Sequence, residues 1–120
     1  MSIENYKNGD VIQVNLGSVA RGEVKGHEQG NKRPCVVIKE FSKLGLLIVV
    51  PFTTTQLKSN YPSYITKILP TENNGLTEDS NALCHQIRTI SVERVEQKSG
   101  VLDDLDFQKI QATLLDTLAL

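Results

Sequence analysis

The sequence predicts a mainly β protein of the α+β class, in which a small barrel or a twisted antiparallel sheet carries one C-terminal helix. Two patterns support this fold class. Residues 34–39 and 46–52 are continuous apolar runs of strand length. Residues 107–118 instead repeat apolar side chains at helical spacing. With 120 residues, the chain is expected to fold as a single domain, residues 1–120, with an ordinary core.

The first strand is expected directly after Gly9-Asp10, a turn signal that precedes apolar residues up to Leu16. Residues 17–32 follow with four glycines and little to bury, which predicts a long loop. Loops of this length in a small domain are more often functional than idle. The loop is therefore a candidate for substrate contact.

The two apolar runs form a predicted hairpin, in which residues 42–45 make the turn. Because both runs are continuous rather than alternating, both faces of these strands should be covered, by a barrel interior, a helix or another subunit. A weaker fourth strand is expected over residues 61–68, where Pro62 indicates an edge position or a strand start.

Two further strands are expected around residues 81–85 and 87–90, after the turn-rich residues 71–77. Residues 91–95 read as one helical turn, because Ser91 is a good cap. These shorter elements complete a strand-rich core.

The C-terminal helix has the clearest signals. Asp103 is a good N-cap, and Asp104 and Asp106 place negative charge on the first turn, where the helix dipole favours it. The helix also carries an apolar stripe, which is interpreted as core packing first and as a dimer surface second. All elements together describe an SH3-like barrel or a compact twisted sheet. The apolar stripe of the helix consists of Phe107, Ile110, Leu114, Leu115 and Leu118.

The composition is that of an ordinary soluble globular chain, 39% apolar and 22% charged. No apolar run is long enough to span a bilayer, and the first residues lack a signal-peptide pattern. A cytoplasmic protein without membrane contact is therefore expected. Cys35 and Cys84 lie in separate apolar runs, which favours two buried free thiols over a disulfide or a metal site. No cofactor is expected.

The formal net charge is −1, but the charges are unevenly distributed. Residues 1–70 carry nine Lys or Arg against five Asp or Glu, a net charge of +4. Residues 71–120 carry four against nine, a net charge of −5. A basic and an acidic side would produce this split, and so would two ordinary solvated faces.

A series of short motifs covers nearly the whole chain. In their order and spacing, and most of all in the QIRTI block, they resemble the MazF/PemK family, the toxin endoribonucleases (mRNA interferases) of type II toxin–antitoxin systems. The resemblance implies a dimeric SH3-like barrel that cuts single-stranded RNA at short sequences and is neutralised by a small acidic antitoxin. The motifs are Gly9-Asp10-Val11, Glu28-Gln29, Arg33-Pro34, Pro51-Phe52-Thr53, Asp79-Ser80 and Cys84-His85-Gln86-Ile87-Arg88-Thr89-Ile90.

RNA cleavage suits the residues present. RNA carries its own nucleophile, the 2′-hydroxyl, whose attack on the adjacent phosphorus gives a 2′,3′-cyclic phosphate and a free 5′-hydroxyl without a metal ion. The protein must supply a base, an acid and a cation for the charged phosphorane. Arg33 suits the cation's role, because its planar fork binds phosphate oxygens with two parallel bonds and stays charged. Pro34 stiffens the junction between this arginine and the strand.

The resemblance provides three more catalytic candidates, Thr53, His85 and Glu28. The Thr53 hydroxyl can bond a phosphate oxygen, and Glu28 matches a loop acid that acts as a base or positions RNA. His85 can give or take a proton near neutral pH. Which residue is the base and which the acid stays open. RNA contacts are assigned to His27, Gln29, Lys32, Gln86 and Arg88.

Two features complicate this assignment. Many relatives have Asp or Glu at the position of His85, so the histidine could catalyse, could contact RNA only, or could mean weakened activity. The loop over residues 17–32 is a few residues longer than is common in the family, so the cut sequence cannot be taken from a relative. Gln86 and Arg88 are expected to alternate on one strand and to share a face with Cys84.

Two alternatives remain. The CcdB family uses the same barrel to bind DNA gyrase without cutting, but depends on residues near the helix end, ideally an aromatic; this chain ends in the aromatic-free residues 116–120. A catalytically silent barrel is the other alternative. Under the main interpretation, the expected partners are single-stranded RNA, a second copy in a homodimer, and an acidic, partly disordered antitoxin that folds on the basic groove.

Overall fold

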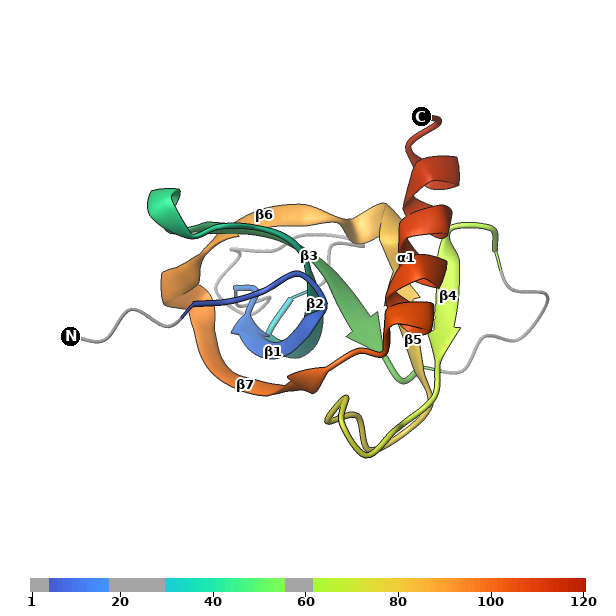
Figure 1. Ribbon diagram of the computed structural model, residues 1–120, viewed down its shortest axis with the longest axis horizontal. Coiled ribbons are helices and arrows are strands. Elements are labelled where there is room, and N and C mark those ends of the chain that lie inside the picture. Colours follow the sequence, from blue (N-terminus) through green and yellow to red (C-terminus); the bar gives the residue numbers. More distant parts are fainter. Residues whose placement is uncertain (1–4, 18–29, 56–61) are drawn as a thin grey trace.

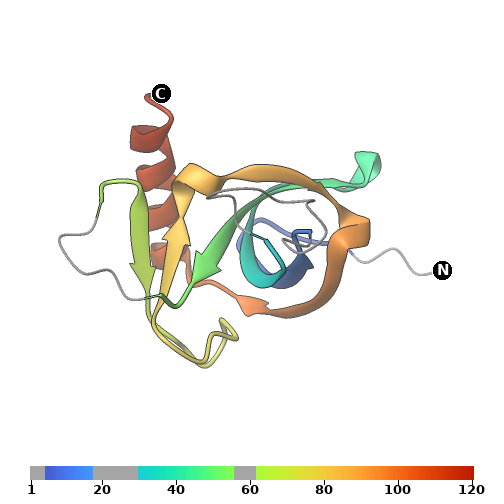
Figure 2. The same ribbon diagram turned by 180° about the vertical axis from the view of Figure 1, so that it is seen from behind.

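The computed structural model describes residues 5–17, 30–55 and 62–120. These residues form a seven-stranded antiparallel sheet and one α-helix, which confirms the predicted fold class. Figures 1 and 2 show the curled part of the sheet on one side of the molecule, and the helix together with the remaining strands on the other. In chain order the elements are β1 (Asp10–Asn15), β2 (Lys32–Phe41), η1 (Ser42–Leu44), β3 (Leu46–Thr53), β4 (Ile65–Ile68), β5 (Ser80–Leu83), η2 (Cys84–Gln86), β6 (Arg88–Ser91), η3 (Val92–Arg94), β7 (Val95–Val101) and α1 (Asp104–Thr117), where η marks a short 3-10 turn.

The strand β3 organises the sheet. The hydrogen-bonded order is β4-β5-β3-β2-β1-β7, and β6 also pairs with β3. On one edge of β3, β6 pairs with the first half of the strand and β5 with its last two residues. The chain then continues from β6 through η3 into β7, which pairs with β1. Strands β1, β2, β3, β6 and β7 therefore curl into a barrel-like ring, although the hydrogen-bonded sheet stays open (Figure 1).

Both faces of the central strands are buried, as the continuous apolar runs predict. Successive residues of β2 alternate between two cores, because neighbouring strand side chains point to opposite faces. The helix-side core lies between the sheet and α1 and consists of Val11, Val36, Val50, Phe52, Ile68, Leu76, Ala82, Cys84, Leu102, Ile110 and Leu114. The inner core fills the curl of the sheet and consists of Tyr6, Ile12, Val14, Leu16, Cys35, Val37, Leu47, Val49 and Ile90. Both cysteines are buried and free, as expected.

The strand β7 was not predicted. Its residues, VEQKSGV, are exposed or only partly buried, so no apolar pattern marks them. The strand forms because its backbone pairs with β1, with two irregularities of register on the way. Polar side chains suit its position at the edge of the sheet, where they discourage pairing with other chains. The preceding turn was predicted correctly, since the Ser91 hydroxyl accepts a hydrogen bond from the Glu93 N–H at 3.2 Å.

The prediction of one face shared by Cys84, Gln86 and Arg88 is wrong. These residues span the turn η2 and the start of β6, and Cys84 is buried in the helix-side core. The pairing of β3 gives the reason. Ala82 lies opposite Phe52 and Arg88 lies opposite Val49. The six positions from Ala82 to Arg88 lie alongside only three positions of β3, from Phe52 to Val49. The extra residues therefore loop out as η2, and the alternation of side chains between the two faces is broken.

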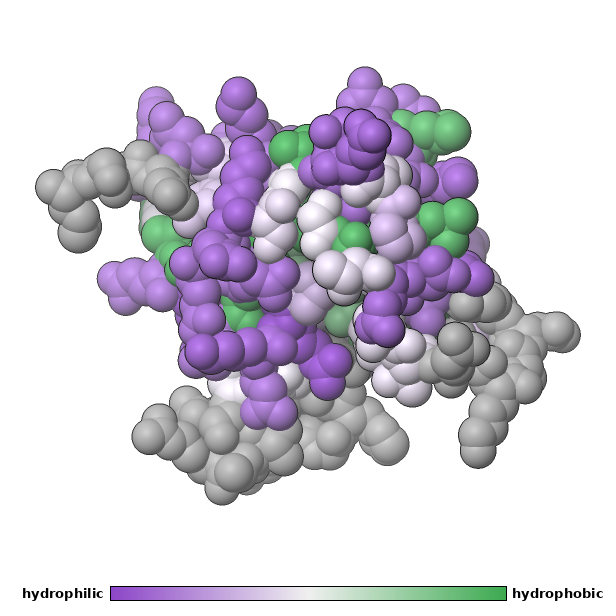
Figure 3. All heavy atoms as spheres, turned by 90° about the horizontal axis from the view of Figure 1, so that it is seen from below, coloured by the Kyte–Doolittle hydropathy of each residue, from purple (hydrophilic) through white to green (hydrophobic). Residues whose placement is uncertain are grey.

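The helix α1 begins after Asp103 as predicted, but the Asp103 side chain makes no capping hydrogen bond. Ile110 and Leu114 are buried against the sheet, whereas Leu118 is 46% exposed. No helix in the described part of the chain is long and apolar enough to cross a membrane. Seen from below Figure 1, the surface is mostly hydrophilic, with small separate hydrophobic areas (Figure 3).

Candidate active site

Arg33 stands near the start of β2, on the face that carries the inner core. It pairs with Val14 of β1, an inner-core residue, and directly opposite residues of antiparallel strands share a face. The Arg33 side chain is half-buried, and its Nε donates a hydrogen bond to the Gly30 carbonyl at 3.2 Å. This bond uses one of five N–H donors and anchors the guanidinium to the chain just before the strand.

Thr53 ends β3 on the same face. Cys35 of β2 and Pro51 of β3 form the last pair of that ladder, and Arg33 and Thr53 each lie two residues beyond it, at the adjoining ends of the two strands. On its other edge, Thr53 pairs with β5, and β5 pairs with β4. Since neighbouring strands are about 4.8 Å apart, the Arg33 and Thr53 side chains can reach one phosphate group together. This arrangement forms a line of side chains across four strands, here called the site row: Arg33, Thr53, Asn81 and Lys67.

Sequence reasoning missed two members of the site row, Lys67 and Asn81. Asn81 is the buried one of the two. It is only 5% exposed, and its Nδ2 donates a hydrogen bond to the Thr55 carbonyl at 3.1 Å. The Thr55 N–H donates to Thr53 Oγ1 at 3.3 Å, and the Thr53 hydroxyl donates to the Thr55 hydroxyl at 3.1 Å. The available signal in the sequence was an amide side chain inside a short run of small and apolar residues.

Arg88 adds a second guanidinium on this face. It pairs with Val49, an inner-core residue of β3. Burial raises the pKa of the Cys35 thiol to about 12, and the positive charges of Arg88 and Arg33 oppose that rise. Both guanidinium groups therefore lie close enough to act on one thiol. Two of the predicted site residues, from β2 and β6, thus converge.

His85 lies at an exposed position of η2. Its ring meets the Tyr64 ring edge-on, with the two centroids 4.4 Å apart. Partial burial lowers the pKa of His85 below its ordinary value, which favours the neutral imidazole, the form that can accept a proton. Tyr64, just before β4, was not singled out from the sequence.

The structure separates Lys32 from the site row. Lys32 is adjacent to Arg33 on β2 and so points to the opposite face, where its Nζ lies 3.2 Å from Glu96 Oε1 of β7. Gln86 is partly buried in η2. The remaining predicted residues lie outside the described residues: His27, Glu28 and Gln29.

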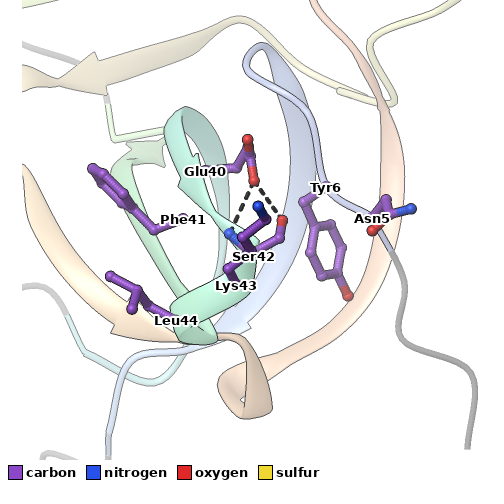
Figure 4. Close-up of a pocket in the computed structure, with 7 residues that line it drawn as sticks. All are labelled: Asn5, Tyr6, Glu40, Phe41, Ser42, Lys43 and Leu44. Atoms are coloured by element: carbon purple, nitrogen blue, oxygen red, sulfur yellow. Dashed lines mark hydrogen bonds between the residues drawn. The ribbon is translucent and has the colours of Figure 1, made fainter.

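A hollow of about 480 Å³ lies at the tip of the β2–β3 hairpin (Figure 4). There the Ser42 hydroxyl and N–H both donate to the Glu40 carboxylate, and these bonds hold the pKa of Glu40 below its usual range. Phe41 lies eight positions after Arg33 on β2, which is about 26 Å of extended chain. The hollow is therefore distinct from the site row. Its lining residues are Asn5, Tyr6, Glu40, Phe41, Ser42, Lys43 and Leu44.

The charges of the site row favour an anionic ligand. Arg33 supplies a permanent cation, and Lys67 supplies a second one that lies 3.5 Å from Asp79. Within residues 5–17, 30–55 and 62–120, no group of three or more His, Cys, Asp or Glu side chains could hold a metal ion. A guanidinium beside a hydroxyl and an amide is a donor set that suits a phosphate.

Comparison with known proteins finds relatives along the whole chain. Residues 7–118 match a family described as PemK-like, MazF-like toxin of type II toxin–antitoxin system. Endoribonuclease EndoA of Bacillus subtilis (strain 168) is 32% identical over 117 residues, covering 95% of each chain. MazF from Deinococcus radiodurans has a similar structure, with a TM-score of 0.74, 18% identity, and coverage of 96% of this chain and 97% of the other. An endoribonuclease in complex with its cognate antitoxin, from mycobacterial species, matches with a TM-score of 0.72, 17% identity and 97% coverage of both chains.

Proposed function

The chain belongs to the PemK-like, MazF-like toxin family of type II toxin–antitoxin systems, and we propose that it is an endoribonuclease that cleaves single-stranded messenger RNA at specific sequences. The observation that carries this proposal is the site row, in which Arg33 and Thr53 lie on one face at the adjoining ends of β2 and β3, each two residues beyond the paired Cys35 and Pro51. A phosphodiester seated there meets a guanidinium fork from β2 and a hydroxyl from β3. These groups can bind both non-bridging oxygens of the scissile phosphate.

In the proposed reaction, the 2′-hydroxyl of the substrate attacks the adjacent phosphorus and the 5′-oxygen leaves. The products are a 2′,3′-cyclic phosphate and a 5′-hydroxyl. Because the nucleophile belongs to the substrate, the reaction needs no metal-bound hydroxide. Arg33 stabilises the charge that develops on the phosphorane, where a preorganised donor has its largest effect.

We assign the proton acceptor to His85. His85 lies on η2, directly after β5, whose Asn81 belongs to the site row, and partial burial lowers its pKa and so favours the neutral imidazole. A neutral imidazole accepts a proton from a hydroxyl more readily than it donates one to a leaving group. Glu28, in the segment before β2, remains the second candidate for proton transfer.

Cleavage of a long single-stranded RNA in EDTA tests this function. We expect discrete cuts by the wild type, and a rate about 10²–10³-fold lower for Arg33→Ala. Lys43→Ala is the matched control, because Lys43 is an exposed cation at the far end of the same hairpin. It should cut like the wild type. Fragments whose 5′ ends accept phosphate from a polynucleotide kinase, and whose 3′ phosphate resists phosphatase until mild acid opens the ring, would identify the cyclic-phosphate chemistry.

Intact RNA after incubation with a folded wild-type protein would contradict the proposal. Such a result would favour the alternative function, that of a toxin that binds its target without cutting RNA. Cuts that persist unchanged in Arg33→Ala would instead contradict the role given to the site row.

We also propose that the protein is a homodimer. An apolar groove of about 460 Å³ lies between α1 and the strands beneath it. Leu115 and Leu118 of this groove are 54% and 46% exposed. A second copy would cover this apolar area, which is costly to leave in water. The groove is lined by Ile38, Ile48, Ile87, Gln111, Leu114, Leu115, Leu118 and Leu120.

The proposed inhibitor is an acidic antitoxin that binds over the site row. The excess of positive charge in residues 1–70, +4, favours an acidic partner, and two of these cations, Arg33 and Lys67, belong to the site row. Co-purification with the product of the neighbouring small open reading frame should yield a complex that no longer cuts RNA. If no complex forms at low salt, the proposed binding of an acidic antitoxin is wrong.

A further inference from the structure

We propose that Asn81 is a positioning residue for the Thr53 hydroxyl. This inference rests on the proposed ribonuclease function and goes beyond it, because it assigns a role to a side chain on β5. The role is indirect: Asn81 would act on the substrate only through the turn that follows β3.

The contacts run from Asn81 to Thr53 in two steps. The buried Asn81 side chain donates from Nδ2 to the Thr55 carbonyl at 3.1 Å. The Thr55 backbone N–H then donates to Thr53 Oγ1 at 3.3 Å. Strand pairing holds the start of this chain of contacts, since Asn81 is paired with Thr53 on one side and with Lys67 on the other.

Thr53 needs such support because β3 ends there. Thr54 and Thr55 are exposed and belong to no strand, so the ladder does not hold them. A threonine hydroxyl at a strand end can occupy more than one rotamer. When the Thr55 N–H donates into Oγ1, it restricts that rotamer. In the free protein the Thr53 O–H points to the Thr55 hydroxyl, 3.1 Å away, and a phosphate oxygen can replace this acceptor.

The prediction is a loss of rate that depends on Thr53. Asn81→Leu removes the donor at similar volume, and Asn81→Asp removes it with almost unchanged shape, in case the leucine variant does not fold. We expect kcat to fall about tenfold in both variants while KM changes less than about threefold, because the lost contact orients rather than binds. In a Thr53→Ala background, the same changes at Asn81 should cost nothing further.

Ser80→Ala is the matched control. Ser80 precedes Asn81 on β5, is 2% exposed, and its hydroxyl donates to the Glu78 carbonyl at 3.0 Å. The control loses the same kind of buried side-chain bond to a backbone carbonyl, but its partner is remote from Thr53 in the sequence and makes no bond to it. Its kcat should match that of the wild type.

The double-mutant comparison separates positioning from mere structural support. An equal loss of kcat at Asn81 with and without the Thr53 hydroxyl would overturn the inference, and so would an unchanged kcat in the Asn81 variants. An inactive, folded wild type would instead overturn the proposed function itself, and this result is read from the wild type alone.

Discussion

At the scale of single residues, the imidazole of His85 links the structure to pH. Burial lowers its pKa below the ordinary 6.5. If His85 accepts the proton of the 2′-hydroxyl, it must be neutral, so kcat/KM should fall on the acid side with a midpoint below pH 6.5. His85→Gln should remove this acid limb and lower kcat about 10²-fold. Rates of cleavage from about pH 4.5 to about pH 8, at fixed ionic strength, would measure both effects, because this range brackets the titration of a histidine.

An acid limb that persists in His85→Gln would rule out this assignment and return attention to Glu28.

The lowered pKa of His85 also has a consequence for stability. Between the lowered pKa and 6.5, the folded state binds fewer protons at His85 than the unfolded state does. This group's contribution to the unfolding free energy is therefore fully present above pH 6.5 and decreases as the pH falls through that window.

The second residue-scale prediction concerns the geometry of the cation at the site row. Arg33→Lys keeps the positive charge but loses the planar fork. If the guanidinium binds two phosphate oxygens in parallel, the lysine variant should remain about 10-fold or more below the wild type in kcat. Single-turnover cleavage of a short RNA would measure this. Full activity with lysine would show that charge alone suffices.

At the scale of elements, β7 is held against the turn at residues 71–76 by close contact between two backbones. A Cβ at Gly100 would lie 2.3 Å from the Asn73 carbonyl oxygen, and the neighbouring Val101 N–H donates to this oxygen at 2.7 Å. Only a glycine permits this approach. Gly100→Ala should therefore lower the unfolding free energy by about 2–3 kcal/mol, as measured by urea denaturation.

Gly45→Ala is the comparison for that experiment. Gly45 has a φ of +68°, but a Cβ there would meet only the Val92 side chain, at 3.9 Å. The cost should be that of the left-handed backbone alone, about 1 kcal/mol. A loss in Gly100→Ala that is no larger than that in Gly45→Ala would show that the two backbones can move apart at little cost, and it would contradict this prediction.

At the scale of the whole molecule, the groove beside α1 predicts the state of association. Leu115→Lys places a charge in the groove and should shift the proposed dimer to monomers in sedimentation at micromolar concentration, because a buried unpaired charge is costly. Leu105→Lys is the control: Leu105 lies on the first turn of the same helix, outside the groove, and is 64% exposed against 54% for Leu115. A monomeric wild type, or equal effects of the two changes, would contradict this interface.

Much of the architecture follows from short stretches of sequence. The continuous apolar runs mark β2 and β3, because strands with two buried faces need apolar residues at every position. The spacing of Ile110 and Leu114 marks the buried face of α1. In the site, the Arg33-Pro34 junction marked the cation, because an arginine before an apolar strand has no role in the core.

What the sequence by itself determined is thus what depends on local burial and local charge: the fold class, the central hairpin, the C-terminal helix and the position of Arg33. Only the tertiary structure decided the parts that depend on pairing between distant strands. Residues 95–101 form β7 because the backbone of this polar segment pairs with the edge of β1. η2 loops out because β5 and β6 share one edge of β3. The site row exists because register sets Asn81 beside Thr53, and no local pattern encodes the register between strands that lie far apart in the chain.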